Sequence, residues 1–147
     1  LVDLPTWQQI ALLGKFSFVD EPLGKWRYYP TQATKTYTVE ITEGFYQLAQ
    51  SYYQQNKSYF DSIQFKEKKL HKFYRKKLVI CYSRSGRYKL IRKEFKSARK
   101  DYFISIFRFG FNEPVWKLRS LIGILFSIFN TDIEKFTKLL GRVSYKE

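Results

Sequence analysis

The sequence predicts a mainly α protein, a helical bundle with a short irregular or β-hairpin insertion near the N-terminus. Three segments, Thr42–Tyr82, Tyr88–Tyr102 and Val115–Phe129, carry apolar residues at spacings of three and four, which is typical of amphipathic helices. Apolar residues make up 44% of the chain and aromatic residues 20%, which supplies a core and argues against disorder. With 147 residues, we expect a single basic helical domain over residues 1–147.

A short helix is expected to begin at Asp3 and to end at Gly14. Aspartate is a frequent helix N-cap, a proline two residues later suits the first turn, and glycine commonly ends a helix. Between residues 16 and 41, two prolines and a glycine interrupt any helix. Phe16–Val19 and Lys35–Ile41 are predicted to be extended, since the second segment alternates as a strand does. The segment 16–41 is therefore the predicted loop or hairpin insertion.

The longest helix is expected to start near Thr42 and to continue toward Cys81, with a break near Phe65. The apolar run Leu78–Tyr82 fits either the end of this helix or a strand. Ser83-Arg84-Ser85-Gly86 has the composition of a turn.

A new helix is then expected over Tyr88–Tyr102, followed by a break at Gly110–Pro114 and an amphipathic helix over Val115–Phe129. Thr131–Glu134 fits a capping box, and a glycine follows ten residues later at position 141. A last helix is therefore predicted over residues 132–140.

Almost all of the net charge of +14 lies in one segment of the chain. Between Lys66 and Lys100 there are fifteen basic residues and two acidic residues, whereas the rest of the chain is nearly neutral. Solubility requires net charge but not its concentration in one segment. The segment is therefore predicted to bind a polyanion.

Nucleic acid is the expected polyanion, held through its phosphates in a basic groove with little sequence information. The groove would be formed by two helical stripes and by the turn at Ser83–Gly86, whose backbone amides would add phosphate contacts. A solvated charged face is the competing interpretation, but like charges at helical spacing destabilise a helix without a counter-charge. The expected binding residues are Lys68, Lys69, Lys72, Arg75, Lys76, Arg84, Arg87, Lys89, Arg92, Lys93, Lys96, Arg99 and Lys100.

Aromatic residues among the basic ones favour single-stranded DNA or RNA over duplex, because unpaired bases stack on aromatic rings. Tyr74 and Tyr88 lie within the basic segment, and Trp26 and Tyr28 lie in a second basic-aromatic cluster. These four residues are the predicted stacking residues. The competing interpretation places such rings in the core.

The sequence contains no recognisable catalytic constellation, and we expect no enzyme activity, no cofactor and no metal. The single histidine, His71, lies between Lys69 and Lys72, where a cationic neighbourhood does not suggest a general base. One histidine and one cysteine cannot supply a zinc site. Neither a P-loop nor a Rossmann glycine pattern is present.

The single cysteine, Cys81, lies in an apolar run and is expected to be a buried thiol. One cysteine excludes an internal disulfide, which is compatible with a reducing, cytoplasmic location. The uncharged stretch Ser120–Thr131 is much shorter than the roughly 20 residues of a membrane helix. No membrane span is therefore expected.

In composition and architecture, residues 42–140 resemble the small subunits of CRISPR interference complexes of the Cascade type. These subunits are basic helical bundles that line the belly of the complex and hold the displaced DNA strand by its backbone. In some subtypes, type I-D among them, they resemble the C-terminal part of the large subunit. The resemblance implies a non-catalytic ribonucleoprotein subunit in antiviral defence, whose partners are nucleic acid and other subunits, including copies of itself. Lys68–Lys76, Arg84–Lys89 and Arg92–Lys100 would carry this role.

Three other interpretations remain open. A ribosomal or organellar RNA-binding structural protein would also be basic, aromatic and enzymatically silent. An interaction module would direct its basic face at an acidic protein or an anionic membrane, with Val115–Phe129 as a docking face. A fragment of a larger polymerase-like or nuclease protein would have its active site elsewhere.

Overall fold

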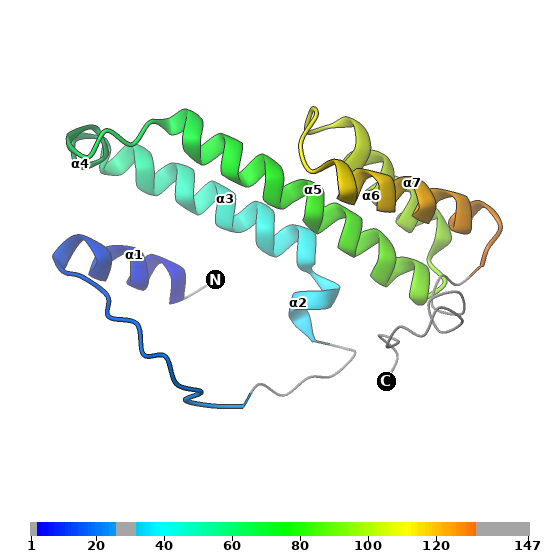
Figure 1. Cartoon of the computed structure of the whole chain (residues 1–147), viewed down its shortest axis with the longest axis horizontal. Coiled ribbons are helices and arrows are strands. Elements are labelled where there is room, and N and C mark those ends of the chain that lie inside the picture. Colours follow the sequence, from blue (N-terminus) through cyan, green and yellow to red (C-terminus); the bar gives the residue numbers. More distant parts are fainter. Residues whose placement is uncertain (1–2, 26–31, 132–147) are drawn as a thin grey trace.

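The computed structural model describes residues 3–25 and 32–131, which form seven helices and no strand (Figure 1). In chain order these helices are α1 (Asp3–Leu13), α2 (Ala33–Thr36), α3 (Thr38–Gln55), α4 (Lys57–Ser62), α5 (Glu67–Ile91), α6 (Phe95–Phe107) and α7 (Pro114–Ile128). The predicted mainly helical class is thereby confirmed. The predicted helix over residues 132–140 lies outside the described residues.

The long helix α5 is the centre of the fold, and α3 runs antiparallel to its first half (Figure 1). Their register is marked by three side-chain contacts. Gln54 Nε2 donates to Glu67 Oε1 at 3.1 Å, Tyr46 stacks on Tyr74, and Tyr82 donates to Glu43 at 2.7 Å. Helix α4 and the turn after it reverse the chain, which confirms the predicted break near Phe65.

The second half of α5 packs against a hairpin formed by α6 and α7 (Figure 1). Helix α6 runs antiparallel to α5, because Ser105 Oγ donates to the Val79 carbonyl at 2.9 Å while Ser85 Oγ donates to Asp101 at 2.6 Å. The hairpin turns at the predicted break between Gly110 and Pro114.

The predicted turn at Ser83–Gly86 is wrong, since all four residues lie inside α5. Turn composition is overridden here by packing: Ser83, Ser85 and Gly86 are buried where α6 and α7 approach α5. The buried hydroxyls are satisfied, because Ser83 Oγ donates to the Trp116 carbonyl at 3.3 Å and Ser85 Oγ donates to Asp101. The chain turns instead at residues 92–94, where Lys93 adopts a left-handed φ of 64°.

The core between α5, α6 and α7 is organised around the ring of Tyr102, which is 2% exposed. A β-carbon at Gly86 would lie 2.7 Å from Tyr102 Cε1, and one at Gly123 would lie 2.6 Å from Tyr102 Cε2. Only glycine therefore lets α5 and α7 come this close to the ring. Burial is the main cause that raises the pKa of the Tyr102 hydroxyl well above its ordinary value.

The predicted hairpin is not formed, because Lys35–Ile41 belongs to α2 and α3, and Phe16–Val19 has no regular structure. The alternating threonines are accommodated in helix, where the Thr42 hydroxyl donates to the Thr38 carbonyl at 2.8 Å. Val39 packs, partly buried, against the core cluster of Leu78, Val79, Tyr82 and Phe109. Burial on α5 thus outweighs the β propensity of this segment. Of the predicted insertion, the described residues 16–25 belong to no helix or strand.

Helix α7 has the predicted amphipathic pattern, but its apolar stripe does not face the core of this fold. Ser120, Gly123 and Ser127 are buried, because small residues allow α7 to approach α5 and α6 closely. Trp116, Ile124 and Phe126 pack partly buried against the core. Seven other apolar residues are left on the outer side, between 40% and 76% exposed: Val115, Leu118, Leu121, Ile122, Leu125, Ile128 and Phe129. This stripe is hereafter called the α7 apolar face.

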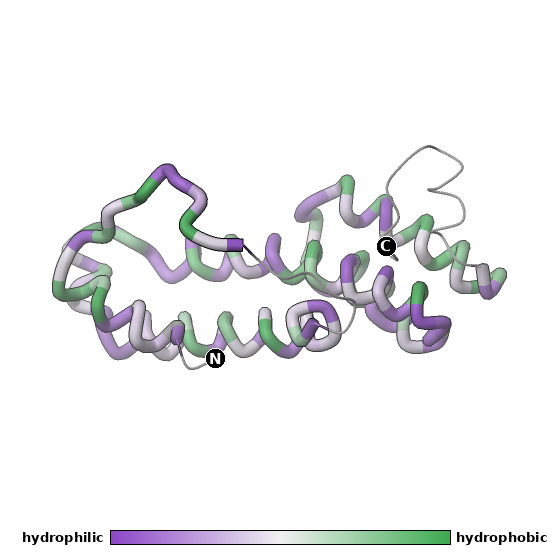
Figure 2. Tube along the Cα trace, turned by 90° about the horizontal axis from the view of Figure 1, so that it is seen from below, coloured by the Kyte–Doolittle hydropathy of each residue, from purple (hydrophilic) through white to green (hydrophobic). Residues whose placement is uncertain are grey.

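Hydrophobic and hydrophilic residues alternate along the helices, as Figure 2 shows. Within residues 3–25 and 32–131, none of the helices is both long and apolar enough to cross a membrane.

Candidate nucleic-acid interface

The first half of α5 carries a cluster of exposed basic side chains. We call this cluster the α5 patch, and it consists of Lys68, Lys69, Lys72, Arg75 and Lys76. Most of it lies on the side of α5 turned away from α3, because Tyr74 and His71 face Tyr46 of α3, and Arg75 forms its edge nearest to Tyr46. The predicted basic stripe on this helix is thus a real surface feature.

A second cluster surrounds the turn into α6. We call it the α6 patch, and it consists of Lys93, Lys96, Arg99 and Lys100. Lys96 and Lys100 are exposed, one helical turn apart, and the opposite side of α6 buries Ala98, Asp101 and Tyr102. Arg99 is half-buried and donates from Nε to the Phe95 carbonyl at 3.3 Å.

The two patches lie on the same side of α5 but do not touch. Lys72, Val79 and Gly86 are spaced by seven residues and so share one side of the helix. Val79 and Gly86 of this row are covered by α6. Lys76 lies nine residues before Ser85, which contacts α6 at Asp101, so about 14 Å of helix separates the patches. The single merged groove of the sequence analysis is therefore replaced by two patches in series.

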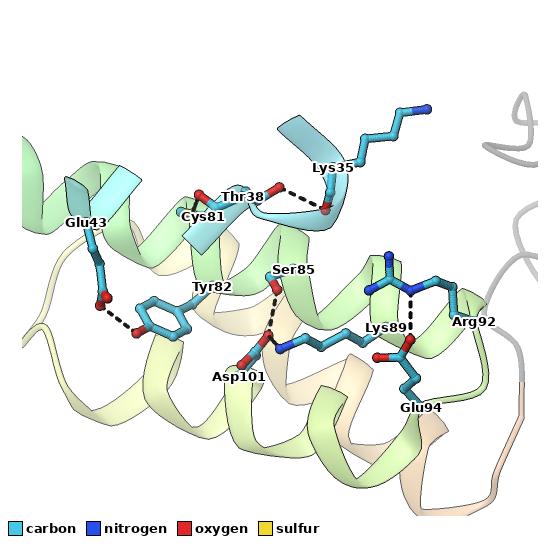
Figure 3. Close-up of polar contacts among 10 residues, drawn as sticks. All are labelled: Lys35, Thr38, Glu43, Cys81, Tyr82, Ser85, Lys89, Arg92, Glu94 and Asp101. Atoms are coloured by element: carbon cyan, nitrogen blue, oxygen red, sulfur yellow. Dashed lines mark hydrogen bonds and ion pairs between the residues drawn. The ribbon is translucent and has the colours of Figure 1, made fainter. Parts of the chain in front are cut away.

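Lys89 is predicted to bind phosphate, but the structure gives it an internal partner. Its Nζ lies 2.7 Å from Asp101 Oδ2, and Asp101 is 4% exposed and also accepts from Ser85 (Figure 3). A buried carboxylate needs such a counter-charge. Lys89 is therefore a structural cation that neutralises Asp101.

Two more of the predicted basic residues have acidic partners. Arg92 Nε lies 2.9 Å from Glu94 Oε1 (Figure 3), and Lys76 Nζ lies 3.8 Å from Glu113. Both pairs are partly exposed, so each cation remains accessible. Arg84 is exposed on α5, and Arg87 is half-buried with an interaction partner in the fold.

Two of the four predicted stacking residues, Tyr74 and Tyr88, have partners within the fold. Tyr74 stacks on Tyr46 with ring centroids 4.8 Å apart, and burial raises the pKa of its hydroxyl. Tyr88 is half-buried and has an interaction partner in the fold. Trp26 and Tyr28 lie outside the described residues.

Sequence reasoning missed an exposed aromatic pair on α6, Phe103 and Phe107. These rings are 51% and 71% exposed and stack on each other. The signal was present in the spacing, because Lys96, Lys100, Phe103 and Phe107 follow one another at intervals of four, three and four. Such intervals place all four residues on one side of a helix.

His71 has a packing role between α3 and α5. Its Nδ1 forms a hydrogen bond with the Tyr46 hydroxyl, and its Nε2 lies 3.4 Å from Glu67. Among the described residues, no group of three or more histidines, cysteines and carboxylates is placed to hold a metal ion.

Cys81 is buried, as predicted, and its Sγ lies 3.0 Å from the Thr38 carbonyl. Burial raises the pKa of the Cys81 thiol to about 11, and only the thiolate is reactive. We therefore expect no reaction of the folded protein with a thiol reagent such as dithionitrobenzoate at pH 8, and one thiol titrated after denaturation. Rapid reaction of the folded protein would contradict the burial of this residue.

Comparison of the chain with protein-family models, with curated proteins and with solved structures gave no significant match. We therefore infer its function from the charge, exposure and packing of the residues described above.

Proposed function

We propose that this chain is a non-catalytic nucleic-acid-binding subunit of a ribonucleoprotein complex, which holds a DNA or RNA strand by its phosphates. The observation that carries this proposal is the uncompensated charge of the two patches. Glu67, Glu94 and Asp101 are engaged by His71, Arg92 and Lys89 respectively. Within the described residues, the exposed lysines 68, 69, 72, 93, 96 and 100 have no acidic partner within ion-pair distance.

Such crowding of like charges costs stability at helical spacing and is relieved by a polyanionic ligand. Two patches about 14 Å apart along α5 suit an extended phosphate backbone better than a compact anion. More specifically, we propose that the chain acts like the small subunit of a Cascade-type complex and binds the displaced DNA strand.

Binding is tested by fluorescence anisotropy with labelled single-stranded DNA, single-stranded RNA, duplex DNA and a folded RNA hairpin, each across a salt series. Each neutralised phosphate contributes about −0.7 to the log–log salt slope for single strands and about −0.9 for duplex. We expect binding with a steep slope and a preference for single strands. A preference for the hairpin would favour the ribosomal type of protein, and no binding at low salt would overturn the proposal.

In the proposed assembly, the α7 apolar face contacts a second copy of the chain. Val115, Leu118, Ile122, Leu125 and Phe129 are spaced by three and four, which is the seam of a two-helix coiled coil. The chain has no acidic residue between Glu113 and Asp132, and its two basic residues here are engaged elsewhere. Lys117 donates to the Ile106 carbonyl, and Arg119 lies over Trp116. Two such seams can therefore meet without charge repulsion at the contact.

We expect sedimentation equilibrium at moderate salt to show a dimer, and Leu118→Glu with Leu125→Glu to give a folded monomer with an unchanged circular dichroism spectrum. The fold should be kept because both side chains are more than half exposed in the single chain. Leu23→Glu, at an 80% exposed leucine outside α7, is the control and should leave the dimer intact. A wild-type chain that stays monomeric at every concentration would contradict self-association.

A further inference from the structure

The outward side of α6 presents two lysines followed by two phenylalanines. Lys96 and Lys100 are exposed, and Phe103 and Phe107 continue the same side of the helix toward its C-terminus. The two rings are 51% and 71% exposed. Their centroids lie 5.8 Å apart and their planes differ by 21°, so the pair forms a nearly parallel stack.

This aromatic pair has no part in the core. The core side of α6 is formed by Ala98, Asp101, Tyr102 and Ser105, all of them buried. Two large apolar side chains left side by side in water are a typical sign of a binding surface rather than of packing.

The antiparallel course of α6 places the pair between the two basic patches. Ser105 lies beside Val79, and Asp101 lies beside Ser85, so α6 runs back along α5 toward the α5 patch. Along the axis of α5, the order is therefore the α5 patch, then Phe107, Phe103, Lys100 and Lys96. The pair occupies the stretch of about 14 Å that separates the patches.

We propose that Phe103 and Phe107 are a stacking platform for unpaired bases of a single-stranded nucleic acid whose phosphates contact Lys96 and Lys100. This inference rests on the proposed function and specifies the ligand of that surface. Every base has a π face, so stacking on an aromatic side chain tolerates any sequence, whereas bases within a duplex are inaccessible to it. The only acid on α6, Asp101, is buried and paired with Lys89, so the outward side carries no negative charge that would repel phosphates.

The test compares the wild-type chain with the double variant Phe103→Leu and Phe107→Leu. Leucine keeps the apolar surface but removes the planar ring. We expect a loss of about 10-fold or more in affinity for single-stranded DNA or RNA, with the salt slope and the duplex affinity unchanged. Lys96→Ala with Lys100→Ala should instead lower the single-strand slope by about 1.4 and weaken both ligands.

Two controls separate stacking from other causes. Phe16→Leu with Phe18→Leu changes two phenylalanines that are exposed in the irregular segment after α1, and it should leave affinity unchanged. An abasic strand keeps the phosphates but lacks bases, so wild type and the Phe103/Phe107 variant should bind it equally.

The outcomes also separate this inference from the proposed function. If the wild type binds single strands and the leucine variant binds them equally well, the platform is wrong while the basic patches stand. If the wild type binds no nucleic acid, both fail. A third outcome would be that the leucine variant still associates with a partner protein, whereas Phe103→Asp with Phe107→Asp does not. The pair would then be an apolar protein contact instead.

Discussion

Replacing Lys68, Lys72 and Arg75 with alanine is expected to weaken single-strand binding roughly 30- to 100-fold at about 0.1 M salt. These residues are exposed members of the α5 patch. Each lost phosphate contact removes one counterion-release contribution, so the log–log salt slope should become shallower by about 2. The fold should be unaffected, because the three side chains lie off the buried side of α5.

The matched control removes the same number of charges elsewhere. Lys15, Lys25 and Lys57 are exposed and lie outside the basic segment, so their triple alanine variant has the same net charge as the α5 variant. It should bind nearly as well as the wild type. Equal losses in the two variants would show that only net charge matters and that the α5 patch is not a site.

Gly123→Ala is expected to destabilise the α5–α6–α7 core by about 1–3 kcal/mol, the usual cost of overpacking. Its β-carbon would overlap the ring of Tyr102, which Gly86 confines from the other side. The ring therefore has no free direction in which to move. Thermal denaturation followed by circular dichroism should show a lower Tm, by about 3 °C per kcal/mol for a chain of this size.

Gly14→Ala is the control for this prediction, because a β-carbon there would meet nothing within 4 Å. It should leave Tm nearly unchanged. Gly123→Ala combined with Tyr102→Leu should lose less stability than the sum of the two single changes, because the smaller side chain makes room for the methyl group. Additive losses would show that the glycine and the ring are not in contact.

The helices were predictable wherever apolar spacing and backbone breakers agreed. The end of α1 at Leu13, the break near Phe65 and the hairpin turn before Pro114 all coincide with glycine, proline or a change of pattern. The concentration of charge between Lys66 and Lys100 was equally predictable, because counting charged residues requires no knowledge of the fold.

Errors occurred where tertiary packing reverses a local signal. Ser83-Arg84-Ser85-Gly86 resembles a turn, yet close helix packing requires small residues at such positions. Composition alone cannot separate these two uses of serine and glycine. The alternation over Lys35–Ile41 favours a strand, but the packing of the partly buried Val39 against the core cluster favours the helix.

Two features of the site could not be read from one chain in isolation. Spacing identifies the apolar stripe of α7 but not whether it faces the core, and the burial of Gly123 decides this. Likewise, the partner of Lys89 is Asp101, twelve residues away on another helix. Only the antiparallel packing of α5 and α6 brings that pair together and removes Lys89 from the binding surface.

The central claim, that a nucleic-acid strand lies across the α5 and α6 patches, is tested most directly by lysine footprinting. The protein is acetylated with an amine-reactive reagent with and without saturating single-stranded DNA, and modification is measured at each lysine by mass spectrometry. We expect strong protection of Lys68, Lys72, Lys96 and Lys100, and none of the equally exposed Lys15, Lys25 and Lys57. Uniform protection, or protection confined to lysines outside the two patches, would contradict the claim.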